Sequence, residues 1–93
     1  MTQQDFQAFE ESARADGFDA VLVREWAPGQ VVGEHSHPFT AHAVIVEGEM
    51  WLTVADATRH LGPGDRFDLA AGTAHSERYG DAGAIYWVAR RNA

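Results

Sequence analysis

The spacing of apolar positions changes near residue 18, from a helical period to a strand-like one. Before that point, apolar residues recur at the i, i+3, i+7 spacing of one helix face. These residues are Phe6, Phe9 and Ala13. Thr2 and Asp5 resemble an N-terminal capping box, and Gly17 supplies a C-terminal stop. The pattern predicts one short helix whose aromatic face packs on the rest of the fold.

From residue 18 onward, short β-branched and aromatic runs alternate with turn residues at intervals of about ten. The predicted strands are Ala20–Trp26, Val31–His37, Ala41–Glu47, Met50–Ala55, Thr58–Leu61, Arg66–Leu69, Thr73–Tyr79 and Ala84–Arg90. Glycine, proline and aspartate separate these runs, as in the turn GPGD at residues 62–65. Short strands without intervening helices imply an all-β antiparallel sandwich or barrel.

The length and composition are those of one soluble domain, with 93 residues of which 45% are hydrophobic. A chain of this size buries only about 60–65% of the surface exposed by its unfolded state. Because the core is thin, association with a second copy is a natural way to enlarge it. We therefore expect a homodimer.

The charge excludes several classes of partner. Fourteen acids against seven arginines, with no lysine, give a net charge of −7. This balance argues against nucleic acid and anionic membrane surfaces as partners. The N-terminal stretch is polar and acidic and no apolar run is long enough to span a bilayer, so we expect a cytoplasmic protein. The absence of cysteine leaves histidine and carboxylate as the strong metal ligands.

The stretch HSH places His35 and His37 two residues apart on a predicted strand. Side chains alternate across a strand, so both imidazoles face the same side, about 6.6–6.8 Å apart along it. That spacing allows two nitrogens to converge on one ion at about 2.0–2.1 Å. Taken alone, the pair also fits two histidines on an exposed strand face.

A second stretch, GDRFDLAAGTAHSERY from Gly64 to Tyr79, contains a Gly-Asp turn, an alternating strand, a glycine turn and His75. HSH, then Gly48 eleven residues later, then GDxFxLxxGTxH resemble the two sequence motifs of the cupin superfamily. The resemblance extends from about residue 18 to the C-terminus. It implies an RmlC-like, single-domain double-stranded β-helix (jelly-roll barrel) over residues 18–93, with the helix of residues 1–17 packed on it.

The resemblance also implies that His35, His37 and His75 point inward to one divalent metal ion. The first cupin motif usually supplies a fourth metal ligand, glutamate or sometimes glutamine, which is separated from the second histidine of the motif by three or four residues. Ala41 and His42 occupy those positions. Alternation counted back from Gly48 places Ala41 inward and His42 outward. A bulge between Pro38 and His42 would instead turn His42 inward as a fourth ligand.

Glu77 lies two residues after His75 and therefore shares its face of the strand. A carboxylate directed into an apolar barrel is costly unless it is paired, hydrogen-bonded or coordinated. Glu77 is thus a candidate metal ligand, partner of a ligand, or catalytic general base. Alternatively, the end of the strand is exposed to solvent, and the Glu77 side chain reaches solvent or pairs with Arg66. Tyr79 stands where the second motif often has asparagine, so the family role of that position does not carry over.

The remaining polar and aromatic residues give weaker signals. We expect His60 to be a surface histidine. Tryptophan and phenylalanine side chains are expected in the core or a dimer interface, with one of them lining the pocket as the alternative. These residues are Trp26, Trp51, Trp87 and Phe67. Three arginines are candidates to bind a substrate carboxylate, or else form solvated ion pairs. They are Arg24, Arg66 and Arg78.

A neutral three-histidine site would leave the full charge of a divalent ion, and about three octahedral positions, available to anionic oxygen ligands. Fe would favour O₂ chemistry, whereas Zn, Mn or Ni would act as a Lewis acid. The sequence therefore predicts a metal-binding small cupin that acts on or binds a small polar organic anion, by dioxygenase or by lyase or isomerase chemistry with Glu77 as base. A noncatalytic sensing or storage cupin, and a structural module with vestigial histidines, are the alternatives.

Overall fold

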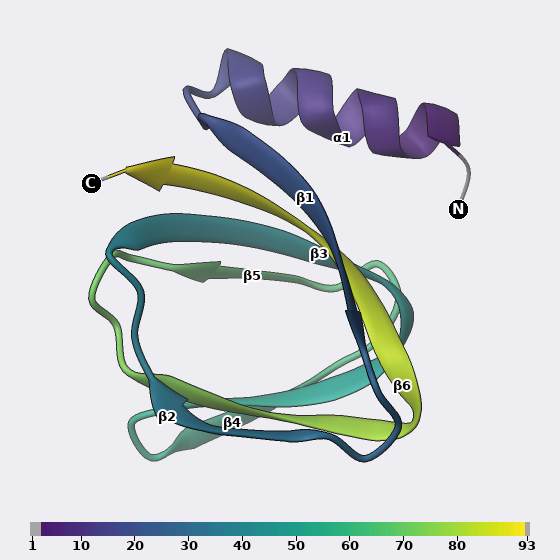
Figure 1. The fold of residues 1–93 in the computed structure, drawn as a ribbon, viewed down its shortest axis with the longest axis vertical. Coiled ribbons are helices and arrows are strands. Elements are labelled where there is room, and N and C mark those ends of the chain that lie inside the picture. Colours follow the sequence, from purple (N-terminus) through teal and green to yellow (C-terminus); the bar gives the residue numbers. More distant parts are fainter. Residues whose placement is uncertain (1–2, 93) are drawn as a thin grey trace.

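The structure is a computed structural model that describes residues 3–92, which form one helix and six strands. The elements are α1 (Gln3–Ala15), β1 (Ala20–Trp26), β2 (Val31–His35), β3 (Phe39–Val54), β4 (Ala57–Leu61), β5 (Arg66–Leu69) and β6 (His75–Asn92). The strands curve around a common interior, and α1 lies outside them across β1 (Figure 1). The predicted all-β barrel with one short N-terminal helix is confirmed.

Two long strands form the centre of the sheet. The strand order is β1-β6-β3-β4, with β2 also pairing with β6 and β5 with β3, and every pairing is antiparallel. The sequence pattern divided β3 and β6 into two strands each, at Gly48 and around Gly83. That division is wrong, because the chain bends at these glycines while the β3–β6 pairing continues past them through Gly48↔Ala84 and Met50↔Tyr79.

Gly48 permits this bend because it combines a left-handed backbone with a close approach between strands. Its φ is 75°, and the β3–β6 register shifts between Gly48 and Met50. A Cβ atom at this position would overlap the carbonyl oxygen of Gly83 and lie 2.8 Å from the Cα of Ala84. Only glycine fits both restrictions.

We expect Gly48→Ala to lower the free energy of unfolding by at least about 2 kcal/mol more than a matched glycine substitution, since it adds a clash to the backbone strain. Gly72→Ala is the control, because Gly72 has a φ of 81° but nothing within 4 Å of its added Cβ. In this control, the strain of an alanine in the left-handed backbone region costs about 1–2 kcal/mol by itself. Urea unfolding followed by circular dichroism measures both, and equal losses would contradict the close-approach argument.

Helix α1 ends where the sequence predicted. The N–H of Gly17 donates to Arg14 O at 3.0 Å and the N–H of Phe18 donates to Ala13 O at 3.0 Å, the pair of bonds that defines a Schellman cap. Gly17 has a φ of 94°, which glycine adopts without strain. The other predicted helix signal, the cap at Thr2, lies outside the described residues.

The aromatic face of α1 packs on the outer face of the sheet, as expected. Phe9 and Ala13 are buried against Val44, Val46 and Trp87, and burial of this face holds the helix on the barrel. A second, larger cluster fills the barrel interior, with Ala43, Ile45 and Met50 fully buried. Within residues 3–92, no helix has the length and apolar character needed to cross a membrane.

Candidate metal centre

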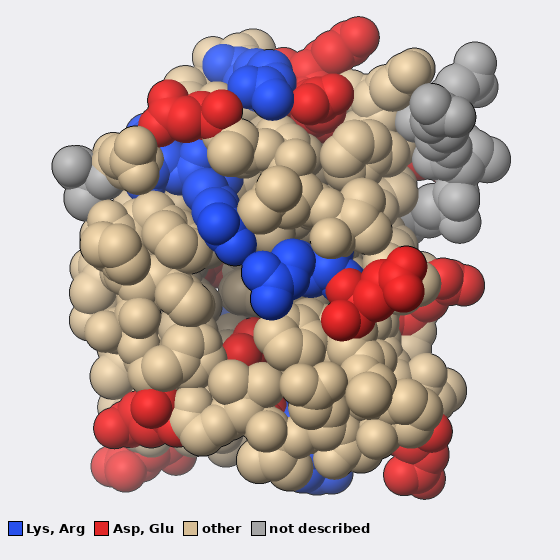
Figure 2. Space-filling model, in the orientation of Figure 1, with Lys and Arg blue, Asp and Glu red and all other residues tan. Residues whose placement is uncertain are grey.

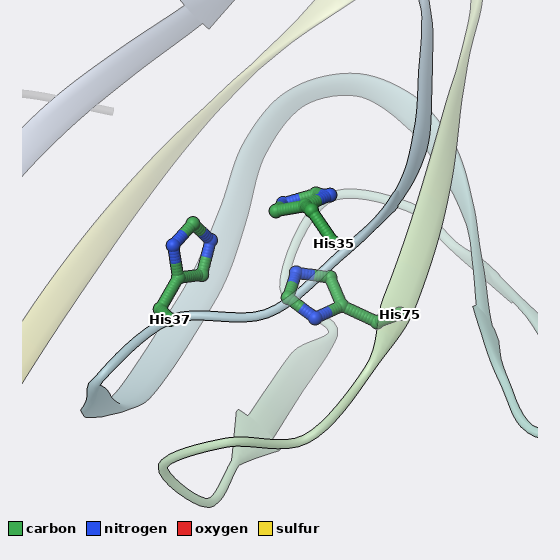
Figure 3. A group of neighbouring side chains, drawn as sticks. All are labelled: His35, His37 and His75. Carbon is green, nitrogen blue, oxygen red and sulfur yellow. The ribbon is translucent and has the colours of Figure 1, made fainter.

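Three histidines from two distant segments of the chain meet inside the barrel. His35 ends β2, His75 begins β6, and the two are cross-strand partners. Strand β2 does not extend to His37 as predicted; His37 follows in a loop before Pro38, which has no N–H to continue a ladder. The loop is held by the N–H of Gly72, which donates to His37 O at 2.8 Å. The three rings turn toward a common space (Figure 3).

The ligand nitrogens of the three histidines, one from each ring, all lie within 4.8 Å of one another. The ring centroids are 4.3 Å apart for His35 and His75, 4.8 Å for His35 and His37, and 5.3 Å for His37 and His75. The expectation that these three residues face the same interior is therefore correct. No other group of three histidines or carboxylates within residues 3–92 converges in this way.

Backbone carbonyls orient two of the rings. Nδ1 of His35 lies 2.8 Å from Gly33 O, and Nδ1 of His75 lies 2.9 Å from Thr73 O. Since a carbonyl only accepts, each Nδ1 carries the proton and donates it, which leaves the lone pair on Nε2. This is the arrangement that fixes the tautomer of a metal-binding histidine.

The surroundings of the third histidine, His37, favour its neutral form. Burial lowers the pKa of His37, and the charges of His35, His75, Arg90 and Arg24 lower it further. A lowered pKa favours the neutral imidazole at physiological pH, and only the neutral ring has a lone pair to offer a metal.

The donor set suits a divalent metal ion. Three imidazoles suit a divalent transition-metal ion such as Zn, Fe, Mn or Ni, whereas ions that prefer oxygen ligands, such as Ca²⁺, are disfavoured. Ligand nitrogens at about 2.0–2.1 Å from one ion would lie about 3 Å apart, so the three nitrogens, which lie within 4.8 Å of one another, would move closer together on binding an ion.

A cavity of about 80 Å³ adjoins the histidines, with mixed polar and apolar walls. Glu77 lines it and is only 6% exposed. The hydroxyl of Tyr79 donates to Glu77 Oε1 at 2.9 Å, and Oε2 lies 3.8 Å from Nε2 of His35. The alternative that Glu77 reaches solvent or Arg66 is therefore wrong. Glu77 is a buried, oriented carboxylate beside the three histidines.

Tyr79 is a permanent donor to Glu77. Burial raises the pKa of Tyr79 far above its ordinary value, and the nearby Tyr86 and Glu77 raise it further. Burial also raises the pKa of Tyr86. Both phenols thus stay protonated across the physiological range, and the stack of Tyr79 on Trp26, with centroids 4.8 Å apart, fixes the donor's position.

His42 lies on the opposite face of β3, as the count of alternation from Gly48 predicted. Its Nδ1 is 2.6 Å from Asp68 Oδ1 and its Nε2 is 3.1 Å from Arg66 Nη1. The ring also stacks on Phe9 of α1. The structure therefore places His42 in the contact between helix and sheet and does not bring it together with the other three histidines.

The arginines and aromatic residues divide between the two faces of the sheet. Arg24, Trp26 and Phe67 line the cavity, whereas Arg66 and Arg78 lie outside, the latter 4.0 Å over the ring of Trp51. His60 is an exposed residue stacked on Trp51, as expected. Sequence reasoning missed Arg90 as a cavity residue. Side-chain alternation along β6 could have placed its side chain, because Tyr86, Val88 and Arg90 are two residues apart and therefore share the inward face of the strand.

Comparison with known proteins identifies the class. Residues 22–88 match the family model described as the cupin domain, and the chain therefore belongs to the cupin family. None of the curated proteins matches the chain in sequence at a significant level.

Solved structures share the fold. A protein of unknown function from Rhizobium leguminosarum bv. viciae 3841 has a TM-score of 0.74 and 19% identity, covering 78% of this chain and 69% of its own. An RmlC-like cupin from Shewanella frigidimarina NCIMB 400 has a TM-score of 0.70 and 22% identity over 78% of this chain and 65% of its own. The DMSP lyase DddQ from Ruegeria pomeroyi DSS-3 has a TM-score of 0.72 and 29% identity over 77% of this chain but only 37% of its own.

Proposed function

We propose that this protein is a metal-dependent small cupin that acts on a small polar organic anion. One observation carries the proposal: three histidines with convergent nitrogens share a cavity with a buried carboxylate, Glu77. His35, His37 and His75 would hold the ion. A divalent ion bound there would supply a Lewis acid that polarises a substrate oxygen or, as Fe, would support O₂ chemistry.

The residues of the chain supply orientation and a base. Glu77 Oε1 is engaged by the hydroxyl of Tyr79, so Oε2 is the oxygen directed toward the histidines and positioned to accept a proton. An oriented base inside the cavity favours catalysis over sensing or storage, which need none. The 29% identity to a protein named as a DMSP lyase supports lyase chemistry over dioxygenation. The homodimeric state and the cytoplasmic location expected from the sequence stay predictions.

Metal removal tests the proposed function. The protein is purified without a nickel column, stripped with a chelator, and reloaded separately with Fe, Zn, Mn or Ni. Each form is assayed for binding and turnover of a panel of short oxo- and hydroxy-acids, diketones and uronates. We expect at least one compound to be turned over by a reloaded form and not by the stripped form. Binding without turnover would favour the sensing alternative, and equal behaviour of stripped and loaded protein would contradict a metal role.

A further inference from the structure

Two arginines line the same cavity as the three histidines, although the chain is acidic overall. Arg24 lies on β1 opposite Tyr86, and Arg90 lies on β6 opposite Ala41, so both share the inward face. The face of the molecule viewed in Figure 2 is hollowed near its centre, where arginine side chains and an acidic side chain border the hollow. The charged side chains that line the cavity of the candidate metal centre, besides the histidines, are therefore Arg24, Arg90 and Glu77.

Neither guanidinium has a carboxylate partner within residues 3–92. Arg24 lies 5.0 Å from the centroid of the Trp26 ring, and Arg90 lies 4.5 Å from that of Phe39. The Nε of Arg90 is buried and has no hydrogen-bond acceptor among the described residues. The rings restrict both side chains, but they do not satisfy a desolvated N–H donor.

Glu77, the carboxylate of this cavity, is engaged elsewhere by Tyr79. Two guanidiniums at one cavity, neither paired with a carboxylate within residues 3–92, match the charge and the hydrogen-bonding preference of a bound carboxylate, which accepts paired N–H bonds from arginine. The cavity volume of about 80 Å³ is small, about three times the roughly 30 Å³ that one water molecule occupies in the liquid. A ligand that contacts both the arginines and the histidines of this cavity must therefore be short.

We infer that Arg24 and Arg90 bind one carboxylate of a short dicarboxylate-like ligand at the cavity entrance and direct its second anionic group toward His35, His37 and His75. This inference rests on the proposed function and specifies its ligand class. The two arginines thus select a doubly charged organic acid over its singly charged analogue. Their role is ligand binding and orientation.

Calorimetric titration of the metal-loaded protein with malonate and succinate tests the inference, with the monoamides malonamate and succinamate as probes of similar shape and one charge fewer. We expect the wild type to bind at least one diacid about 10-fold or more tightly than its monoamide. Arg24→Gln and Arg90→Gln should each weaken diacid binding by about 10- to 100-fold and reduce the preference over the monoamide, with metal content unchanged.

Arg91→Gln is the matched control, because Arg91 is the next residue on β6 but is exposed and lies 5.1 Å from the Phe18 ring centroid. It removes the same charge and should leave diacid affinity within about 2-fold of wild type, since exposed charges are strongly screened. Arg24→Lys and Arg90→Lys keep the charge and provide folded variants if the glutamine variants are unstable. They should also weaken binding, because lysine lacks the paired donors.

The outcomes separate this inference from the proposed function. Wild-type diacid affinity in both arginine variants, equal affinity for diacid and monoamide, or no diacid binding by wild type would each overturn the arginine site. Arginine-dependent diacid binding that is equally strong in stripped and metal-loaded protein would support the arginine site and contradict the metal role.

Discussion

His35→Ala and His75→Ala each abolish stoichiometric metal binding, with an expected loss of at least about 100-fold in affinity. The two rings come from different strands, and backbone carbonyls hold each with Nε2 free. Removing one therefore leaves two nitrogens that cannot hold the ion alone. Elemental analysis of protein purified without a nickel column, followed by titration of the stripped protein with Zn²⁺, measures the loss.

Two other histidines provide the controls for this experiment. His60 is exposed and stacks on Trp51, so His60→Ala should retain metal. His42 lies on the outer face with Asp68 and Arg66, so His42→Ala should retain metal as well. Loss of metal in His42→Ala would establish the fourth-ligand alternative. Full retention in both His35→Ala and His75→Ala would contradict the proposed site.

Glu77→Gln should reduce kcat by about 10²- to 10⁴-fold on any compound that the wild type turns over, with metal content unchanged. Glutamine preserves the size of the side chain and an oxygen to accept the Tyr79 bond, but it cannot accept a proton at the position of Oε2. Steady-state kinetics on the metal-loaded variant give the loss, and elemental analysis shows that the site is still filled.

Glu49→Gln is the matched control for this substitution. Glu49 Oε2 lies 3.3 Å from Nε2 of His60, so it is also a carboxylate beside a histidine, but on the outer surface. Its replacement should leave kcat within about 2-fold of wild type, as is usual for surface substitutions distant from the chemistry. If Glu77→Gln retains wild-type turnover, Glu77 is not the base.

Much of the candidate site was accessible from local sequence rules. The step of two between His35 and His37, and between His75 and Glu77, predicted that each pair shares a face. Both pairs line the cavity, although His37 lies just beyond the end of β2. Alternation counted from Gly48 placed His42 outward, which the structure bears out through its bond to Asp68. Within the strands these predictions succeeded because alternation over a few residues depends on the backbone alone. His37 instead reaches the cavity from a loop, whose carbonyl oxygen at His37 accepts the N–H of Gly72.

Other features followed no local rule. Gly48 was interpreted as a strand break, whereas φ values of 75° and 73° at Gly48 and Gly83 let β3 and β6 bend and continue. A turn residue has the same appearance in sequence whether the chain reverses there or a long strand bends. Arg90 was not singled out, because alternation along one strand shows neither that an inward side chain reaches a cavity nor that Arg24 lines the same cavity.

The sequence by itself determined the strand-rich class, which follows from hydrophobic period and turn residues, and the shared face of His35 and His37, which follows from side-chain alternation. That His75 joins them was implied by the resemblance of two sequence motifs to those of the cupin superfamily. Tertiary structure alone decided that Glu77 is buried and bonded to Tyr79, that His42 belongs to the helix contact, and that Arg24 and Arg90 line one cavity with the histidines. The physical reason is that burial, desolvation and charge pairing are set by residues far apart in the chain, and only closure of the barrel brings them together.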